Sequence, residues 1–331
     1  MPEFALTPYF HPTTVCFIDD NRSFLDSLEL ELPRTWACRM FADPALALEY
    51  LEQPPELPPL MDRCFSMQRR ADEAIIRLDL DLVEQEINNP DRFRHNSVVV
   101  VDYSMPSMNG LDFCAAVSDP YIRKAMLTGV ADEKTAVAAF IAGLIDRFIP
   151  KQTNLSTSIV HDFVDELQQE YFAQYSARLK NALAIDPPGF LTDQAVADRI
   201  AALMKQEAIV EYYLSSSPTG LLMLTADGTI SRLVILEENE MQAQARYAAS
   251  HSAPPAIVNA LQKRKLLLCL SGDTPEDYFG DETFNWREKV VDASTVRGVR
   301  GNYYLGVWRD MPVDINFDPA TASYNAYLAS L

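Results

Sequence analysis

In the stretch SVVVVDYSMPSMNG, residues 97–110, four consecutive valines are followed by an aspartate and then by a loop that contains Pro, Asn and Gly. Consecutive β-branched residues predict a strand that is buried on both faces, as the strands of parallel sheets are. Asp102 stands where this strand leaves the core. Because burying an unpaired carboxylate is costly, a carboxylate at the end of the most apolar strand indicates that this edge of the sheet holds a functional site.

The segments around this strand alternate between short apolar runs and amphipathic runs with helical spacing. Further strands are predicted at 13–19, 36–42, 123–130 and 146–151, and helices at 21–33, 43–53, 111–120 and 132–144. Strands that alternate with helices predict a doubly wound α/β domain, in which five parallel strands are covered by helices on both faces in the flavodoxin-like arrangement. We place this domain at residues 1–153.

Residues 54–95 interrupt this pattern before the third strand. They begin with PPELPP, which ends the preceding helix, and continue as a charged sequence with interspersed Ile, Leu and Val. This composition predicts a helical insertion of one or two helices. Two interpretations stay open for it, an added packing layer and an arm that docks a partner.

Residues 154–189 are predicted to form a linker built on one long helix over 154–186, which Pro187 and Pro188 close. Apolar residues three or four positions apart mark one face of that helix. They are Val160, Val164, Leu167, Tyr171, Tyr175, Leu179 and Ala182. Because the helix is longer than covering a sheet requires, the stripe predicts a coiled-coil-like contact with a second copy and therefore a homodimer.

Residues 190–331 are predicted to form a separate α+β domain. Two apolar runs flank Asp227-Gly228, which is a strong signal for a β-hairpin. Helices are predicted at 191–217, 238–250 and 254–265, and further strands at 266–270 and 302–308.

Composition limits the partners of the chain. Its formal net charge is −19 and its isoelectric point is about 4.6. A phosphate backbone needs a cationic surface, so we expect no nucleic acid as a partner. Five cysteines are scattered mostly through apolar runs without metal-ligand spacing, which predicts reduced thiols and a cytoplasmic protein. No apolar run approaches the roughly 20 residues of a membrane span, so we expect no membrane association.

Polar residues follow the predicted strands at the edge where ligands bind in doubly wound sheets. Asp19 and Asp20 end the first strand and Asp102 ends the third, so we expect three carboxylates close together. Like charges raise one another's pKa, and oxygen-only ligands favour magnesium as the neutralising cation. Thr128 and Lys151, which end the fourth and fifth strands, add a hydroxyl and an ammonium. This combination predicts phosphoryl transfer to a carboxylate.

Four motifs, in this order, resemble the receiver domain of two-component response regulators. They are IDDN (18–21), VVVVDYSMPSMNG (98–110), LTGVADE (127–133) and FIPK (148–151). The resemblance covers about residues 13–153 and implies that Asp102 is the phosphoacceptor. It further implies magnesium ligands at Asp20, at Asp19 through water, at Asp102 and at the backbone carbonyl of Ser104, a switch pair of Thr128 and Phe148, and a phosphate contact from Lys151.

The sequence departs from the family at two places. Gln152 follows Lys151 where the family usually has proline, and Pro150 precedes it. The family also has only a few residues where 54–95 stand. Both departures affect partner surfaces more than the phosphorylation chemistry.

The resemblance implies a phosphorylation-controlled regulator that receives its phosphoryl group from a sensor histidine kinase or a phosphotransfer protein. The C-terminal domain shows no helix-turn-helix and no catalytic motif that we recognise. SSSPTGLLMLTADGTIS (215–231) faintly resembles the entry into a PAS-like sensory domain. Two functions stay open for this domain: an output module that binds a small molecule or a protein, and an enzyme of unrecognised type that the receiver gates.

Overall fold

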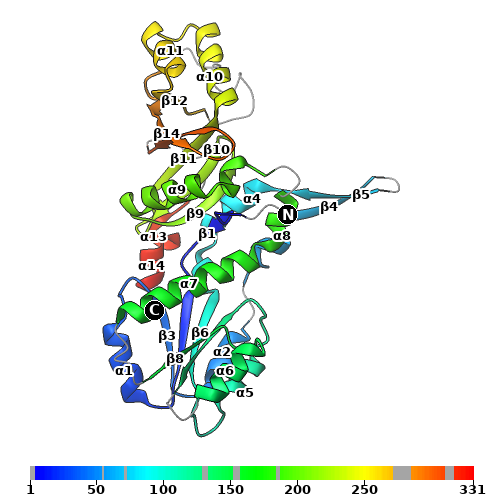
Figure 1. Cartoon of the computed structure of the whole chain (residues 1–331), viewed down its shortest axis with the longest axis vertical. Helices are drawn as coiled ribbons and strands as arrows, with labels where there is room; N and C mark the ends of the chain where they lie inside the picture. Colours follow the sequence, from blue (N-terminus) through cyan, green and yellow to red (C-terminus); the bar gives the residue numbers. More distant parts are fainter. Residues whose placement is uncertain are drawn as a thin grey trace. The chain divides into compact units, whose positions relative to one another are not determined.

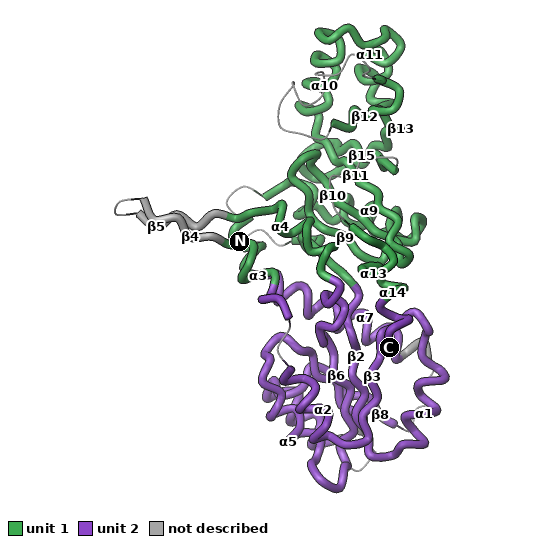
Figure 2. Tube along the Cα trace, turned by 180° about the vertical axis from the view of Figure 1, so that it is seen from behind, with its two compact units in different colours: residues 1–11, 60–89, 178–326 green, residues 12–59, 90–177, 327–331 purple. Residues whose placement is uncertain are grey.

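The computed structural model describes residues 4–53, 56–70, 73–128, 133–151, 157–183, 187–270, 285–309 and 317–331. The chain divides into two units (Figure 2). We call them the parallel unit, residues 12–59, 90–177 and 327–331, and the antiparallel unit, residues 1–11, 60–89 and 178–326. Neither unit is one continuous segment, because the chain passes between them after residues 11, 59, 89, 177 and 326, five times in all.

A five-stranded sheet forms the centre of the parallel unit (Figure 1). In spatial order its strands are β3 (Ala37–Phe41), β2 (Thr14–Ile18), β6 (Asn96–Asp102), β7 (Arg123–Thr128) and β8 (Arg147–Pro150). All neighbouring strands run parallel. The predicted flavodoxin-like sheet is therefore confirmed.

The four valines of β6 supply the cores on both faces of this sheet. Val98 and Val100 lie in one core cluster. Val99 and Val101 lie in the other. This division follows from strand geometry, since successive side chains point to opposite faces. The first cluster is covered by α1 (Arg22–Glu31) and α7 (Thr157–Tyr175), and the second by α2 (Pro44–Leu51), α5 (Gly110–Ala116) and α6 (Glu133–Ile141).

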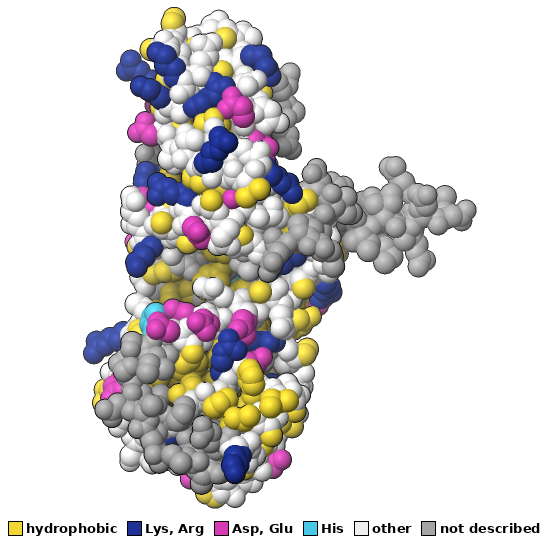
Figure 3. All heavy atoms as spheres, viewed as in Figure 1, with side chains coloured by type: hydrophobic (Ala, Val, Ile, Leu, Met, Phe, Trp, Pro, Cys, Tyr) yellow, Lys and Arg dark blue, Asp and Glu magenta, His cyan; other side chains and the backbone are white. Residues whose placement is uncertain are grey.

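The apolar stripe of α7 covers the sheet of its own chain. Val160, Val164 and Leu167 are at most 3% exposed and belong to the cluster that contains Val98 and Val100. The prediction that this stripe pairs two copies is wrong, because these side chains are already buried. Acidic side chains form a row along the outward face of α7 (Figure 3), among them Asp162, Asp165, Glu166 and Glu170.

The predicted long helix is broken at Ser176. α7 ends at Tyr175, and α8 (Ala177–Leu183) follows. The buried hydroxyl of Ser176 donates a hydrogen bond to the carbonyl oxygen of Phe172 at 2.5 Å. A serine that bonds to the carbonyl four residues earlier bends a helix, which accounts for the break. Residues 154–156 and 184–186 of the predicted helix lie outside the described residues.

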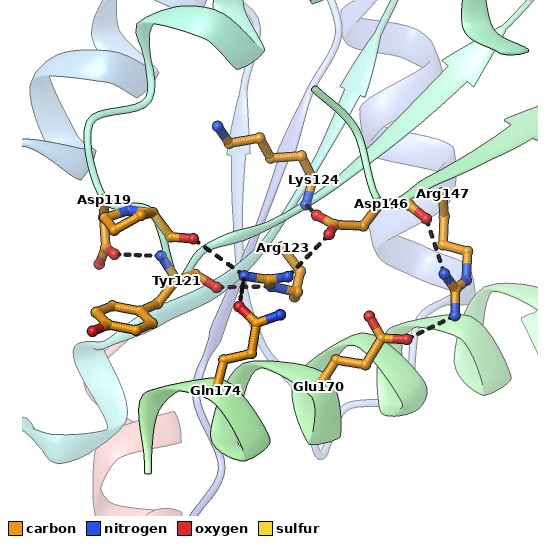
Figure 4. A network of polar contacts seen from close by, with 9 residues as sticks. Asp119, Tyr121, Arg123, Lys124, Asp146, Arg147, Glu170 and Gln174 are labelled. Carbon is orange, nitrogen blue, oxygen red and sulfur yellow. Dashed lines mark hydrogen bonds and ion pairs between the residues drawn. The ribbon is translucent and has the colours of Figure 1, made fainter. Parts of the chain in front are cut away.

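A polar network fastens α7 to the sheet (Figure 4). The buried guanidinium of Arg123 in β7 donates to Asp146 Oδ1 at 3.0 Å and to Gln174 Oε1 at 2.7 Å. Arg147, at the start of β8, donates to Glu170 Oε1 at 2.7 Å. Because Gln174 and Glu170 both belong to α7, charged hydrogen bonds tie the second half of this helix to β7 and β8.

The antiparallel unit contains a six-stranded sheet (Figure 1). In spatial order its strands are β1 (Tyr9–Phe10), β9 (Ile209–Ser216), β10 (Thr219–Thr225), β11 (Ile230–Glu237), β15 (Asn302–Trp308) and β14 (Ser294–Arg297). The pairing of β10 with β11 confirms the hairpin predicted around Asp227-Gly228. The predicted C-terminal α+β architecture is thus confirmed.

Strand β9 corrects the prediction of a helix through residue 217. The helix, α9 (Gln194–Gln206), ends with Glu207 as its C-cap. Ala208 then takes a left-handed backbone conformation with a φ of 53°, after which β9 begins. A left-handed residue after a helix is usually glycine, so the alanine left no signal of this helix end in the sequence.

Helices cover both faces of the antiparallel sheet as well. Val196 and Ile200 of α9 pack in one core cluster with residues of β9, β10 and β11. Met241 of α10 (Glu238–Ser250) packs in another cluster, together with Val234 and Trp308. The remaining elements are η4 (Gly189–Thr192), α11 (Pro255–Gln262), the two-stranded sheet of β12 (Leu266–Leu268) and β13 (Val290–Asp292), α13 (Pro319–Ala322) and α14 (Tyr324–Leu328).

The insertion is only partly helical. It comprises α3 (Leu60–Arg63), β4 (Phe65–Arg70), β5 (Glu73–Leu78), α4 (Leu80–Glu84), η1 (Gln85–Asn88) and η2 (Pro90–Arg94). Strands β4 and β5 pair antiparallel, where the sequence predicted helix. The residues of this stretch have good helix propensity, but propensity is a weak prior that strand pairing overrides.

A largely buried ion pair joins α4 to the antiparallel sheet. Arg232 of β11 donates to both carboxylate oxygens of Glu84, at 3.1 Å and 2.7 Å, and also bonds to Ser215 of β9. Residues 60–89 accordingly belong to the antiparallel unit. Of the two interpretations of the insertion, this contact fits an added packing layer.

Leu167→Ala should lower the free energy of unfolding of the parallel unit by about 2–5 kcal/mol, because it leaves a cavity between α7 and the sheet. Leu30→Ala is the matched control: Leu30 is 88% exposed on α1, and its truncation should change stability by less than about 0.5 kcal/mol. Hydrogen exchange at the amides of β6 measures both. Unchanged protection in Leu167→Ala together with altered self-association would contradict this placement of α7.

Candidate functional site

Three carboxylates meet at the carboxyl ends of two neighbouring strands. Asp19 follows β2, and Asp102 is the last residue of β6. These two acids and Asp20 each offer one oxygen atom, and the three atoms lie within 4.8 Å of one another. Asp19 and Asp102 are buried, whereas Asp20 is exposed. The structure therefore brings together the acids that the sequence placed in one cluster.

The ammonium of Lys151 bridges the two buried acids. Its Nζ lies 2.7 Å from Asp19 Oδ2 and 2.9 Å from Asp102 Oδ1. Lys151 directly follows β8, so its position comes from the same edge of the sheet as the acids. The proline that usually follows this lysine in receivers is therefore not needed for the side chain to reach the cluster.

The loop after β2 orients the Asp19 side chain. The backbone amide of Asn21 donates to Asp19 Oδ1 at 2.9 Å. Asn21 is also the N-cap of α1, since its side chain accepts from the amide of Phe24 at 3.2 Å. The Phe24 ring in turn lies 4.9 Å from Lys151 Nζ, within cation–π range. Phe24 is a residue of this site that the sequence motifs do not indicate, because its position three residues after the N-cap is its only signal.

Burial and charge act in opposite directions on these groups. Burial raises the pKa of the Asp19 carboxyl group. Hydrogen bonds from the Lys151 ammonium and the Asn21 amide oppose this rise, whereas the negative charge of Asp102 adds to it. Burial disfavours the charged form of Lys151, but the hydrogen bonds and charges of Asp19 and Asp102 outweigh it and raise the lysine pKa. The lysine therefore stays an ammonium that compensates part of the negative charge.

The remaining charge and the ligand atoms suit a divalent cation. Three carboxylates and one ammonium sum formally to −2, since three negative charges meet one positive charge. Only oxygen atoms face the cluster centre from the acids, and oxygen ligands are the ones that magnesium prefers. Asp19, Asp20 and Asp102 thus fit a magnesium ion, which would be held by their carboxylates.

The loop that follows Asp102 packs against its backbone. A Cβ atom at Gly110 would overlap the carbonyl oxygen of Asp102, so this position must be glycine. The amide of Gly110 donates to the carbonyl of Tyr103 at 3.0 Å. Asn109 starts α5 as its N-cap and accepts from the amide of Asp112 at 2.9 Å. The Asn-Gly pair of the opening stretch therefore fixes the turn beside the carboxylate.

The other predicted site residues lie at this edge, and their roles stay predictions. Thr128 ends β7, where its backbone pairs with Pro150 of β8; its side chain lies outside the described residues. Phe148 of β8 is half-buried, and its ring meets Phe140 of α6 edge-on with centroids 6.3 Å apart. Ser104 is exposed two residues after Asp102.

Comparison with solved structures gives a match over the full chain. The Legionella pneumophila response regulator LqsR is 30% identical in sequence at a TM-score of 0.79, and the match covers 99% of this chain and 97% of the LqsR chain. This chain belongs to the response regulators. The predicted receiver resemblance is confirmed, and the parallel unit is the receiver of this response regulator.

Two shorter structures also match this response regulator. A CheY-like receiver domain protein from Methanospirillum hungatei is 18% identical at a TM-score of 0.31, covering 48% of this chain and 96% of that chain. The FixJ-N structure is 20% identical at a TM-score of 0.32, with the same two coverages, 48% and 96%. The sequence matches no family model and no curated protein. Among the described residues, no helix has the length and apolar character that a membrane crossing requires.

Lys151→Ala should make the stabilisation of the response regulator by magnesium larger than in the parent. Without the ammonium, buried Asp19 and Asp102 lack a counter-charge, and a bound cation then supplies it. Thermal unfolding with magnesium chloride and with a chelator measures the effect. Lys134→Ala, an exposed lysine on α6, is the control and should behave as the parent. A smaller magnesium effect in Lys151→Ala would argue against the cluster as the metal site.

Proposed function

We propose that this response regulator accepts a phosphoryl group on Asp102 from a sensor histidine kinase or a phosphotransfer protein. The observation that carries this proposal is the bridge from Lys151 to both buried acids, with Asp20 in the same cluster. A lysine and three carboxylates at one sheet edge supply a nucleophile, a cation for the phosphoryl oxygens and oxygen ligands for a metal.

In the proposed reaction, one carboxylate oxygen of Asp102 attacks the donor phosphorus. The new P–O bond forms as the bond between phosphorus and the donor atom breaks, and the donor leaves with the electron pair of that bond. The product is an acyl phosphate, so the negative charge of the Asp102 carboxylate passes to the phosphoryl group. The Lys151 ammonium then pairs with a phosphoryl oxygen, which carries that charge.

Magnesium supplies charge neutralisation of the phosphoryl oxygens when it is bound. We assign its ligands to Asp19, Asp20 and Asp102, with the Ser104 carbonyl as the backbone ligand that the resemblance implies. Asp19 is held by the Asn21 amide and by Lys151, so its orientation is set before the metal arrives. This preorganisation spares the site the cost of ordering a ligand.

Treatment with acetyl phosphate should add one phosphoryl group to the parent protein and none to Asp102→Asn, because only the Asp102 carboxylate can form the acyl phosphate. Removing magnesium with a chelator should abolish the gain. Intact-mass measurement reports both results. Asp26→Asn, an exposed acid on α1, is the control and should be labelled like the parent. Equal labelling of Asp102→Asn would rule out the assignment.

We further propose that the signal leaves through β8 and α6 and changes a homodimer. Phe148 touches Phe140 of α6 edge-on, so a rotation of Phe148 toward Thr128 would remove a contact of that helix. Val137, Phe140 and Ile141 are exposed apolar residues of α6. The dimer that the sequence predicted therefore has an available apolar surface here, in place of the buried stripe of α7.

Beryllium fluoride, a mimic of the phosphoryl group, should increase the sedimentation coefficient of the parent but not of Ile141→Glu, because a charge at this exposed position would have to be buried in the dimer. Leu30→Glu is the matched control, since Leu30 is equally apolar and similarly exposed but lies on α1. Identical behaviour of Ile141→Glu and the parent would exclude α6 as the dimer surface.

The antiparallel unit is proposed as the output domain, and we assign it a ligand-binding function. Support comes from a cavity of about 340 Å³ between the start of α10 and the turn that joins β14 to β15.

A further inference from the structure

The residues that line the cavity of the antiparallel unit are mostly of polar types and come from distant parts of the sequence. Glu237 and Glu238 contribute from the start of α10. Arg300, Asn302 and Tyr303 contribute from β15 and the turn before it. A volume of about 340 Å³ lies at the small end of the range for ligand sites, which suits a compact molecule.

Tyr303 ends in a buried hydroxyl that has no hydrogen-bond partner among the described residues. The side chain is 1% exposed. Its Oη and the Oε1 of Glu237 both lie close to Gly189, where an added Cβ would overlap the hydroxyl and stand 2.7 Å from the carboxylate oxygen. Glycine at 189 therefore leaves room for two polar groups to converge. A buried hydroxyl without a partner is rare in native proteins, so this hydroxyl calls for a water molecule or a ligand as its partner.

The two glutamates of the cavity differ in what they already bind. Glu238 accepts from Arg264, from Tyr304 Oη at 2.6 Å and from Gln242 at 3.0 Å. These hydrogen bonds, with Arg264 as the largest contribution, lower the pKa of Glu238 to about 2. Glu238 is thus a fixed and neutralised part of the wall. Glu237 is exposed, and as the N-cap of α10 its side chain accepts from the backbone amide of Glu240 in a capping box. It forms no ion pair in the described part of the chain, and a carboxylate has further lone pairs that a ligand can use.

Arg300 provides the opposite charge on the other wall. It is exposed and pairs with no acidic residue in the described ranges. Its turn is held in place by buried Asp193, whose Oδ2 accepts from the amide of Val299 at 2.6 Å. The cavity therefore presents a carboxylate from the end of β11 and a guanidinium from a fixed turn, and neither forms an ion pair with a described residue.

We propose that this cavity binds a small zwitterion of the amino-acid class. The ammonium of the ligand pairs with Glu237 and lies against the Tyr303 hydroxyl, while its carboxylate pairs with Arg300 and accepts from the amide of Asn302. A simple anion is repelled by the glutamates, and a simple amine gains no charged hydrogen bond from Arg300. This inference rests on the proposed ligand-binding role of the antiparallel unit and is independent of phosphorylation at Asp102.

Calorimetric titration of the unphosphorylated full chain tests the proposal with matched probes. The probes are γ-aminobutyrate and glycine as long and short zwitterions, n-butylamine as the amine alone and butyrate as the carboxylate alone. At least one zwitterion should bind, and the two single-charge probes should bind about tenfold more weakly, because each lacks one charged hydrogen bond. Binding of neither zwitterion, or equal binding of butyrate, overturns the proposal.

Variants of Arg300 and Glu237 test which charged group of the ligand each of these residues binds. Arg300→Gln should weaken the zwitterion about tenfold and leave n-butylamine unchanged. Glu237→Gln should weaken both. If Arg300→Gln leaves the zwitterion affinity as in the parent, the assignment of its carboxylate to Arg300 is overturned.

Two tyrosine variants separate a ligand contact from a structural role. Tyr303→Phe should weaken zwitterion binding roughly threefold to tenfold without lowering the melting temperature, because its hydroxyl has no protein partner to lose. Tyr213→Phe removes a buried hydroxyl that donates to Glu211 Oε2 at 2.8 Å, so it should lower the melting temperature and leave binding unchanged. Full binding in Tyr303→Phe overturns the assigned contact. Because no phosphodonor is present, these results are independent of the labelling of Asp102.

Discussion

Repulsion between carboxylates at the ends of two adjacent buried strands is the constraint on which the parallel unit is built. Asp19 and Asp102 are buried. An uncompensated charge in the protein interior costs several kcal/mol. Lys151 supplies one compensating charge from the end of another strand of the same sheet. The valines that bury β6 on both faces hold its end rigidly, and the polar network of α7 anchors β7 and β8. A rigid sheet can thus keep like charges close enough to share one cation.

The parallel unit was largely predictable because its signals are local. Buried parallel strands are continuous apolar runs, and the functional side chains stand where those runs end. The face of α7 was misread because an apolar stripe does not reveal what it packs against. Strand β9 was not predictable because α9 ends at an alanine with a left-handed backbone, where a glycine would have marked the helix end. The hairpin of β4 and β5 was not predictable because its residues favour helix, and the pairing that makes them strands leaves no pattern in the sequence.

The candidate sites show the same division between local and distant information. The acids, Lys151 and the Asn-Gly turn were each visible in short motifs, whereas Phe24 acts through a ring that packs under the ammonium. The cavity of the antiparallel unit was beyond prediction, since Glu237 and Tyr303 are 66 positions apart and Gly189 stands 48 positions before Glu237. Only folding brings such groups together, and no motif announces them.

The five passages of the chain between the two units have a consequence for how this protein can evolve and be dissected. Receivers that precede their output domain as one continuous segment can be exchanged by recombination at a single point in the gene. In this protein, no single cut in the gene would separate one unit from the other. β1 is encoded before β2 and α4 after it, and both pack on the antiparallel sheet. A gene fusion that replaced the first 153 codons would remove an edge strand and a packing helix from the antiparallel unit. We therefore expect that the two units were inherited together and were not exchanged separately between genes.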